Sequence, residues 1–551
     1  MPRVWDDCAN NIMFRHEVGD AEAVEHVFES ADHIISQRMA ISRVAPSPIE
    51  ARGIVVDYDS DEDFHTIFIS AQSAFGIRRY LAADIFNEPE SKFRVKIDDV
   101  GGSFGMKGAF FLEYALTVWA ARKLGRPVKW IESRSEAFLS DYQGRDNIAN
   151  VELALDNNGK FLAVRSKITA NLGAYPSTMP TGPATSHVGG LAGVYRFQAA
   201  HVEITGVYTN TSSVGSYRGA GRPEASYMIE RIIDLAAVDM KMDPVEMRRK
   251  NMISPDEIPY KTPFYFKFEG KPFGFFEYDS GNFPKVLDRA VDAADYEGFE
   301  NRRTESSRSG KLRGIGVSYI IEMAASPGFE AVKIEIDSAA NITVRAGTVN
   351  LGQGHHTLYK QILSELLDVE ANTIRVIEGD TDQLEKGTGT GSSRTATMGG
   401  SAAKIACHQI IDKGKTISAE IFEASPSDIV YEDKVFKIPG TDKNISFAEI
   451  AEITNSPERC PKGVSLGWVE TGIHNSLAPN WPNGCHISEV EIDAETGKIS
   501  LIKYTAVDDV GATVNPKMLE AQVHGGVAQG LGQILMEEVK YDHQTGQLLT
   551  G

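Results

Sequence analysis

The segment Asp98–Gly108, with the sequence DDVGGSFGMKG, places Gly101, Gly102 and Gly105 between a strand-like stretch and a helix-like stretch. Residues 93–97 (FRVKI) have the pattern of a strand, and Glu113–Leu124 has the apolar spacing of a helix. Glycine lets backbone N–H groups approach a ligand closely, and the first N–H groups of a helix attract anions. One such loop alone is more often a tight turn packed against the core.

Four further glycine-rich loops follow along the chain. They are SYRGAGRPEA from Ser216, NLGQGHHT from Asn350, GTGTGSSRT from Gly387 and HGGVAQGLGQ from His524. Each lies just before, or at the start of, a helix-like pattern. Five such segments between residues 98 and 533 indicate that several parts of the backbone converge on one large anionic ligand.

Composition restricts the classes of partner. The chain has 551 residues, is 42% hydrophobic and carries a net charge of −20, which is typical of a multidomain globular protein and disfavours nucleic acid and anionic membranes as partners. No apolar run is long enough to predict a membrane span. The four cysteines have neither zinc nor iron–sulfur spacing, which favours reduced thiols in a cytoplasmic protein and places any iron–sulfur cluster on another chain.

Strand-like and helix-like stretches occur in both halves, so the fold class is α+β with two large mixed domains. We expect a first domain over 1–255, a connecting segment over 256–311 and a second domain over 312–551. Within the connection, 254–282 is expected to be extended and 300–311 to be an exposed polar loop. The patterns predict helices at 113–124, 225–240, 243–251, 358–367, 402–422 and 515–537, and strands at 65–70, 93–97, 332–336, 341–346 and 373–377.

The common nucleotide motifs are absent: the chain has no GxGxxG, no complete P-loop and no HExxH, and Ser216, Ser392 and Ser393 lack the GxSxG setting of a serine hydrolase. Side chains near the loops are instead mostly amides and hydroxyls, which can donate to an anion without compensating its charge, although routine loop capping explains many of them. Arg218 and Arg222 flank glycines and can neutralise an anion, with a surface salt bridge as the alternative for Arg222.

Taken in order, these segments resemble the large, molybdenum-binding subunit of the xanthine dehydrogenase/aldehyde oxidase family, in the branch of the carbon monoxide dehydrogenase large chain. The motifs GGSFG at Gly101–Gly105, YRGAGRPEA at Tyr217–Ala225, GQGH at Gly352–His355 and the helix motif at Asn515–Gly532 carry the resemblance. It extends from about residue 12 to the end of the chain.

The resemblance implies a molybdopterin, in its cytosine dinucleotide form, held without covalent bonds in one cleft shared by the two domains. It places Gln72 beside the reacting molybdenum centre. The implied cofactor contacts are Gly101, Gly102, Phe104, Gly105, Tyr217, Arg218, Gly352, Gln353, Gly354, Ser393, Arg394, Thr395 and Gln522. No side chain is expected to ligate the metal directly, since the pterin dithiolene holds it.

The implied activity is hydroxylation of an aldehyde or N-heteroaromatic carbon with oxygen taken from water. Electrons are expected to leave through an FAD-binding medium subunit and a 2Fe-2S small subunit, in a dimer of heterotrimers located in the cytoplasm. Reduction of an aromatic thioester is a further activity of the same family that these motifs leave open.

Three departures from the family pattern bear on this interpretation. Gly219 replaces the copper-binding cysteine of carbon monoxide oxidisers, and Gly108 follows Lys107 where purine oxidisers carry a glutamate. No GxGE segment, which holds the general-base glutamate in the family, occurs in the sequence. We therefore expect a fragment or half of a split subunit that lacks this base, and the alternative to an enzyme is a non-catalytic cofactor-binding or assembly subunit.

Overall fold

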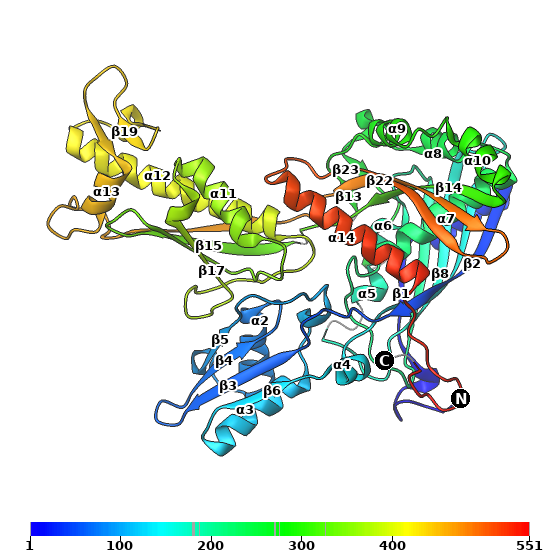
Figure 1. Ribbon diagram of the computed structural model, residues 1–551, viewed down its shortest axis with the longest axis horizontal. Helices are drawn as coiled ribbons and strands as arrows, with labels where there is room; N and C mark the ends of the chain where they lie inside the picture. The colour runs from blue at the N-terminus through cyan, green and yellow to red at the C-terminus, as the bar shows by residue number, and fades with distance from the viewer. Residues whose placement is uncertain are drawn as a thin grey trace.

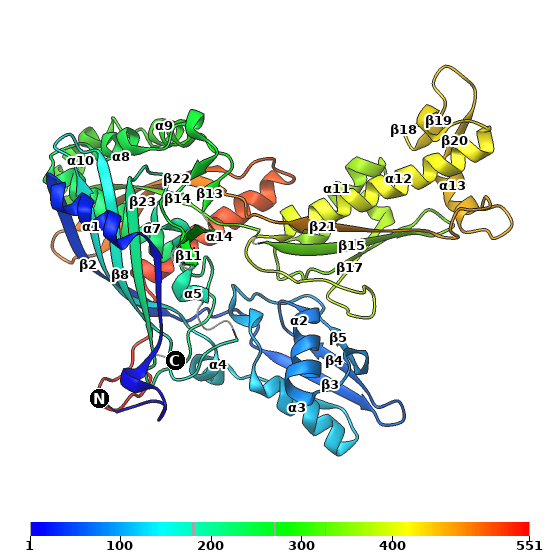
Figure 2. The ribbon, with the colours of Figure 1, turned by 180° about the vertical axis from the view of Figure 1, so that it is seen from behind.

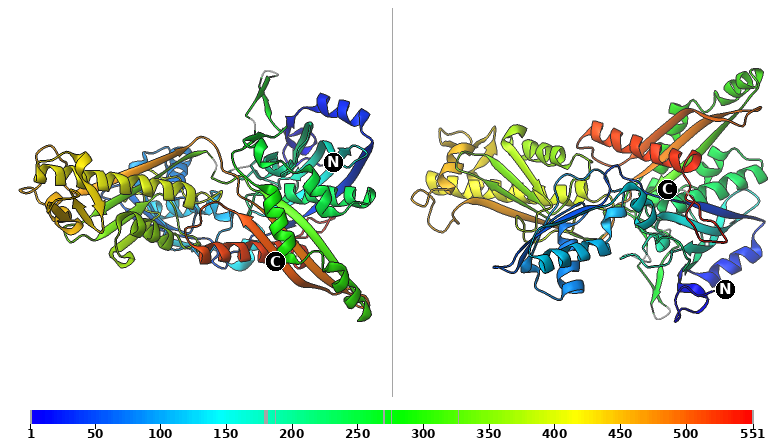
Figure 3. Two further views of the ribbon diagram at one scale, coloured as in Figure 1. Left: turned by 90° about the horizontal axis from the view of Figure 1, so that it is seen from above. Right: turned by 60° about the horizontal axis from the view of Figure 1, so that its bottom comes forward.

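The computed structural model describes residues 2–178, 182–186, 188–268, 271–274, 276–325 and 327–549. The molecule is elongated, and the N-terminus lies at the opposite end from helices α12 (Gly400–Phe422) and α13 (Phe447–Thr454) (Figure 3). The mixture of helices and strands in both halves confirms the α+β class. Within the described residues, no helix combines the length and apolar character needed to cross a bilayer.

The N-terminal half is built on a five-stranded sheet, here called the N-terminal sheet, with the strand order β1-β9-β8-β7-β2. Helix α7 packs on one face through Met228, Ile229 and Ile232, while Val24 and Phe28 of α1 lie against the other face (Figure 2). The elements are β1 (Ile12–Gly19), α1 (Ala21–Ser30), β2 (His33–Val44), β7 (Gly144–Leu155), β8 (Phe161–Asn171), β9 (Ala199–Val207), α7 (Arg222–Asp239) and α8 (Pro244–Asn251).

A second sheet from the C-terminal half, β14-β22-β23, packs on the other side of α7 and shares its core. Tyr319, Cys485 and Ile487 belong to the same buried cluster as the apolar face of α7. The elements are α9 (Phe283–Ala294), α10 (Phe299–Arg308), β14 (Lys311–Ile321), β22 (Asn483–Asp493), β23 (Ile499–Asp509) and α14 (Pro516–Leu535). The two halves of the chain are therefore joined by one continuous hydrophobic core.

The expected extended connection over 254–282 is wrong in part, because this segment folds into the core. It forms short paired strands, and Phe264 and Tyr278 are fully buried in the cluster that contains α7. The strands are β10 (Tyr260–Lys261), β11 (Phe266–Phe268), β12 (Lys271–Phe273) and β13 (Glu277–Tyr278). Aromatic side chains bury large apolar areas, and this burial outweighs the turn-forming content of the segment.

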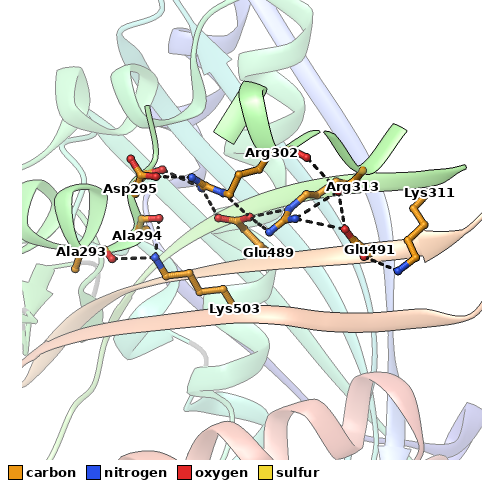
Figure 4. A network of polar contacts seen from close by, with 10 residues as sticks. Ala293, Ala294, Asp295, Arg302, Lys311, Arg313, Glu489, Glu491 and Lys503 are labelled. Carbon is orange, nitrogen blue, oxygen red and sulfur yellow. Dashed lines mark hydrogen bonds and ion pairs between the residues drawn. The ribbon is translucent and has the colours of Figure 1, made fainter. Parts of the chain in front are cut away.

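The expected exposed loop at 300–311 is also wrong, because these residues form α10 and the start of β14. The helix is polar all round, and it is held by ion pairs rather than by an apolar face. Arg302 of α10 and Arg313 of β14 both bind the buried carboxylate of Glu489 on β22 (Figure 4). Partners almost 190 positions away in sequence thus stabilise a helix that local composition disfavours.

Glu489→Gln should lower the free energy of unfolding by about 2 kcal/mol at neutral pH, because it removes the charge that two arginines share. Burial alone would raise the pKa of Glu489. The hydrogen bonds from Arg302 and Arg313 outweigh this effect and hold the pKa below its ordinary value of 4.5. The stabilisation is therefore complete above pH 4.5 and is lost as the pH falls through the folded-state pKa.

Urea unfolding of both proteins between pH 3 and 8 tests this prediction, with the exposed Glu300→Gln as the matched control on α10. The difference in free energy of unfolding between the wild type and Glu489→Gln should become smaller at the acidic end of this pH range. A difference that stays constant with pH would show that the charge of Glu489 contributes nothing.

Two smaller sheets lie beside this core and carry most of the glycine-rich loops. The small sheet has the order β5-β4-β3-β6 and the distal sheet has the order β17-β16-β15-β21 (Figure 1). The small sheet contains β3 (Gly53–Asp59), β4 (Phe64–Ile69), β5 (Phe93–Lys96) and β6 (Val128–Ile131), with α2 (Ala74–Arg79), α3 (Leu112–Leu124) and, after it, α4 (Arg134–Ser140). The distal sheet contains β15 (Gly328–Ile336), β16 (Ile342–Ala346), β17 (Ile374–Glu378) and β21 (Trp468–Ser476), with α11 (His355–Leu367), α12, α13 and the strands β18 (Val430–Glu432), β19 (Val435–Lys437) and β20 (Asn444–Ser446).

Candidate functional site

Loops from the small sheet, the N-terminal sheet and the distal sheet meet at one junction, and α14 lies close to it (Figure 1). The loop at 98–108 precedes α3, the loop at 216–221 precedes α7, the loop at 350–354 precedes α11, and the loop at 387–394 precedes the π-helical turn before α12. Each of these four loops ends near a helix N-terminus, as the sequence predicts. Positive backbone dipole ends are therefore gathered in one place.

The first and second loops are in direct contact. Gly105 has φ +109°, and a Cβ atom at this position would lie 2.6 Å from the carbonyl oxygen of Ser216. On the other side of the contact, the N–H of Arg218 donates to the carbonyl of Phe104 at 2.9 Å. Only glycine fits at position 105, and its absence of a side chain is what lets the two loops pair.

Gln72 joins the first loop to the fourth. Its side-chain N–H donates to the carbonyl of Thr390 at 2.7 Å, its side-chain oxygen accepts from the Ser103 hydroxyl, and the whole residue is 7% exposed. Its backbone N–H donates to the carbonyl of Lys107 at 3.1 Å and its carbonyl accepts from the N–H of Thr390 at 2.9 Å. The amide is therefore fixed in orientation on both of its polar atoms.

The third loop packs against α14. Gly352 has φ +105° and an added Cβ would meet nothing within 4 Å, whereas at Gly354 it would meet Met518 of α14 at 2.9 Å. The side-chain oxygen of Gln353 accepts from the backbone N–H of Leu351 at 2.7 Å, which leaves the N–H₂ group of this amide as a donor. The backbone at Gly352 is therefore not packed against another part of the described chain.

The fourth loop uses its arginine internally. The guanidinium of Arg394 donates to the buried carboxylate of Glu330 and to the carbonyl of Gly389 at 2.9 Å. Its side chain therefore shapes the loop, and the structure does not offer it as a donor to a ligand. Ser393 has φ 50° and is exposed, while the neighbouring Thr395 is 6% exposed.

The fifth glycine-rich segment, from His524, is not a loop but the interior of α14. Arg218 lies along this part of the helix: at Gly525 and Gly526 an added Cβ would be 3.4 and 3.7 Å from its guanidinium, which is ordinary van der Waals contact. Arg218 Nη2 donates to the carbonyl of Gln522 at 2.9 Å.

Arg218 is a half-buried cation, and among the described residues no carboxylate pairs with it. Burial lowers its pKa below the ordinary value. Arg222 differs, because its Nε lies 3.7 Å from a carboxylate oxygen of Glu322, so the ion-pair alternative holds for Arg222. An unpaired arginine beside glycine-lined backbone is the arrangement that a negatively charged ligand completes.

Glu322 is a residue that the motifs did not point to. It follows β14, it faces Arg222, and three residues later Ala325 donates its N–H to the carbonyl of Ser392 in the fourth loop at 2.8 Å. Burial raises the pKa of Glu322 to about 7 although Arg222 opposes the shift. The one local signal is its place at the end of a strand, which many structural residues share.

The donor set fits a molybdopterin. Its members are backbone N–H groups at helix starts, the amides of Gln72 and Gln353, and the cation of Arg218. The close approach of the first two loops at Gly105 leaves no room for a side chain there. In the described part of the chain, no group of three or more His, Cys, Asp or Glu side chains is placed to hold a metal ion. Non-covalent contacts of this kind suit a cofactor that brings its own metal ligands.

Comparisons with known proteins show the family of the chain. Two family models, both described as a molybdopterin cofactor-binding domain, match the chain, one at residues 4–252 and the other at residues 289–551. The carbon monoxide dehydrogenase large chain of Hydrogenophaga pseudoflava is 33% identical, over 98% of this chain and 68% of its own length. The 6-hydroxypseudooxynicotine dehydrogenase complex subunit gamma of Paenarthrobacter nicotinovorans is 31% identical, over 96% of this chain and 65% of its own length.

Solved structures show the same likeness. Quinoline 2-oxidoreductase from Pseudomonas putida 86 superposes with a TM-score of 0.91 at 29% identity, over the whole of this chain and 70% of the other. Reconstituted carbon monoxide dehydrogenase from Oligotropha carboxidovorans superposes with a TM-score of 0.89 at 32% identity, over 98% and 68%. The chain thus spans about two thirds of the relatives that it matches, and it belongs to the molybdopterin-binding large-subunit family that includes the carbon monoxide dehydrogenase large chain.

Proposed function

We propose that this chain is the cofactor-binding catalytic subunit of a molybdenum hydroxylase that oxidises an aldehyde or N-heteroaromatic carbon with oxygen from water. The observation that carries the proposal is Arg218, a half-buried cation without a carboxylate, set among glycine-lined loops. When bound, the molybdopterin supplies the redox-active metal that accepts electrons from the substrate carbon.

The residues of this chain bind and orient. Backbone at Gly101, Gly102, Gly105, Gly352 and Gly354 borders the cofactor, and Arg218 neutralises negative charge on it. Further contacts are proposed for Phe104, Tyr217, Gln353, Ser393, Thr395 and Gln522, and for the backbone of Arg394. Gln72, held on both polar atoms, presents a fixed amide beside the reacting centre, and a fixed dipole there costs no reorganisation during the reaction.

The finer points of the assignment are also proposals. The cofactor is the cytosine dinucleotide form, and it lies in one cleft between the domains at 1–255 and 312–551, joined by 256–311. An FAD-binding medium subunit and a 2Fe-2S small subunit carry the electrons away, in a dimer of heterotrimers in the cytoplasm. Relatives that are named as the subunit of a complex or as a large chain support partner subunits.

The sequence at two positions narrows the substrate. Gly219 cannot bind copper, which argues against carbon monoxide as the substrate, and Gly108 supplies no carboxylate for a purine. An aldehyde or an N-heteroaromatic compound is left as the substrate class.

Metal and pterin analysis of the purified protein tests this function. We expect molybdenum and pterin in equal amounts, with release of cytidine monophosphate on acid treatment. Arg218→Gln should lower both contents together, whereas Arg313→Gln, which changes a distant arginine of the ion-pair network, should not. Wild-type protein that contains neither molybdenum nor pterin would overturn the proposal.

A further inference from the structure

Arg145 is a buried arginine that no motif singles out. It lies at the start of β7, it is 4% exposed, and both Arg145 (φ 69°) and Asp146 (φ 66°) have left-handed backbone. Non-glycine residues rarely adopt this conformation, and two in succession within a strand are strained. Such strain persists only where the surrounding contacts hold the backbone in place.

The guanidinium of Arg145 binds two backbone carbonyls of the second glycine-rich loop. Nη1 donates to the carbonyl of Tyr217 at 3.0 Å and Nη2 donates to the carbonyl of Arg218 at 2.7 Å, and the guanidinium also lies over the Tyr217 ring at 5.1 Å. Two successive carbonyls are thus turned toward one planar cation, which a lysine with its single nitrogen cannot reproduce.

A buried carboxylate completes the arrangement. Glu224 lies 3.3 Å from Arg145 and also accepts from the N–H of Gly221, at the start of α7. Both side chains are 2% exposed. The charge of Arg145 is therefore neutralised inside the protein, whereas the guanidinium of Arg218 has no carboxylate partner among the described residues.

We propose that Arg145 is a positioning residue: it fixes the Tyr217 and Arg218 carbonyls so that the Arg218 N–H pairs with Phe104 and the Arg218 guanidinium lies along α14. The pairing of these two loops and the direction of the Arg218 side chain then depend on a buried residue of β7 that belongs to neither loop. The proposal rests on the proposed function only in that Arg218 is the group being positioned.

Arg43 offers a matched control, because it is an equally buried arginine on the neighbouring strand β2. It is 3% exposed, forms an ion pair with Asp146 at 2.7 Å and donates to the Ser212 carbonyl at 2.7 Å. Within the described part of the chain, it forms no hydrogen bond or ion pair with residues 216–222. A purely structural role for Arg145 predicts that Arg145→Lys and Arg43→Lys behave alike.

Hydrogen exchange read by mass spectrometry, on the purified full chain, separates the two roles. In Arg145→Lys we expect exchange in peptides covering 216–222 and 101–108 to rise by about tenfold, which is the loss of one charge-assisted hydrogen bond. Peptides from β8 should change by less than about twofold, because global stability is retained. Arg43→Lys should leave 216–222 and 101–108 as in the wild type.

Arg145→Gly keeps the test valid where the lysine variant folds poorly, because glycine accepts the left-handed backbone and leaves a space in place of the side chain. Guanidinium added at millimolar concentration should restore protection of 216–222, and ethylammonium should not.

Unchanged exchange of 216–222 in Arg145→Lys, or an equal rise in Arg43→Lys, would overturn the proposal. Failure of guanidinium to restore protection in Arg145→Gly would also count against it. These readouts need no cofactor, so they stand even if the wild-type protein contains no molybdenum and the proposed function fails.

Discussion

Gly105→Val should remove the molybdopterin from the purified protein. A Cβ atom at this position would lie 2.6 Å from the backbone oxygen of Ser216, and φ is +109°, which side chains disfavour. Because the obstructing atom is backbone, it cannot rotate away, and the two loops must separate. We expect a penalty on the order of 3 kcal/mol for the paired loops and a loss of bound molybdenum of roughly a hundredfold.

The comparison with Gly310→Val isolates the clash from backbone strain. Gly310 also has positive φ, +75°, but an added Cβ there meets nothing within 4 Å. Molybdenum content by mass spectrometry and pterin content by fluorescence should be normal in Gly310→Val and near zero in Gly105→Val. Stoichiometric molybdenum in Gly105→Val would refute the assignment of this loop to the cofactor.

Gln72→Ala should lower turnover by about a hundredfold while most of the cofactor stays bound, because a preoriented donor beside the reacting centre is lost. The same change removes the hydrogen-bond partner that Gln72 provides to the Thr390 carbonyl and to the Ser103 hydroxyl. The free energy of unfolding should therefore fall by about 1–3 kcal/mol. Steady-state kinetics normalised to molybdenum content measure the first effect.

Ser73→Ala is the control for this prediction, because Ser73 also donates across to the fourth loop, to the carbonyl of Thr388 at 2.7 Å. It should reduce stability without the hundredfold loss of turnover. Equal losses of cofactor and turnover in Gln72→Ala would mean that Gln72 only holds the loops together.

Local sequence determined many of the elements that carry the site. Apolar spacing and the glycine at its end place the α3 helix within one residue of its observed start, and Asp243 caps α8 through the N–H groups of Val245 and Glu246 as its motif predicts. These signals depend on hydrogen bonds and side-chain contacts within a few residues, so they survive without knowledge of the fold.

A polar helix was beyond this reasoning. The α10 helix is held by Glu489 on a distant strand, and this contact between segments far apart in the sequence outweighs the local preference. The helix predicted over 515–537, with its glycines included, is confirmed by α14.

The order and spacing of the glycine-rich segments were enough to identify the family and to indicate which backbone segments converge. The sequence alone does not separate Arg218, which has no carboxylate partner among the described residues, from Arg394, whose guanidinium is held by Glu330. Both arginines lie next to a small residue in a glycine-rich loop: Arg218 precedes Gly219, and Arg394 follows Ser393. Only the tertiary structure decided which arginine has a free charge, because the availability of a charge depends on whether folding brings a carboxylate to it.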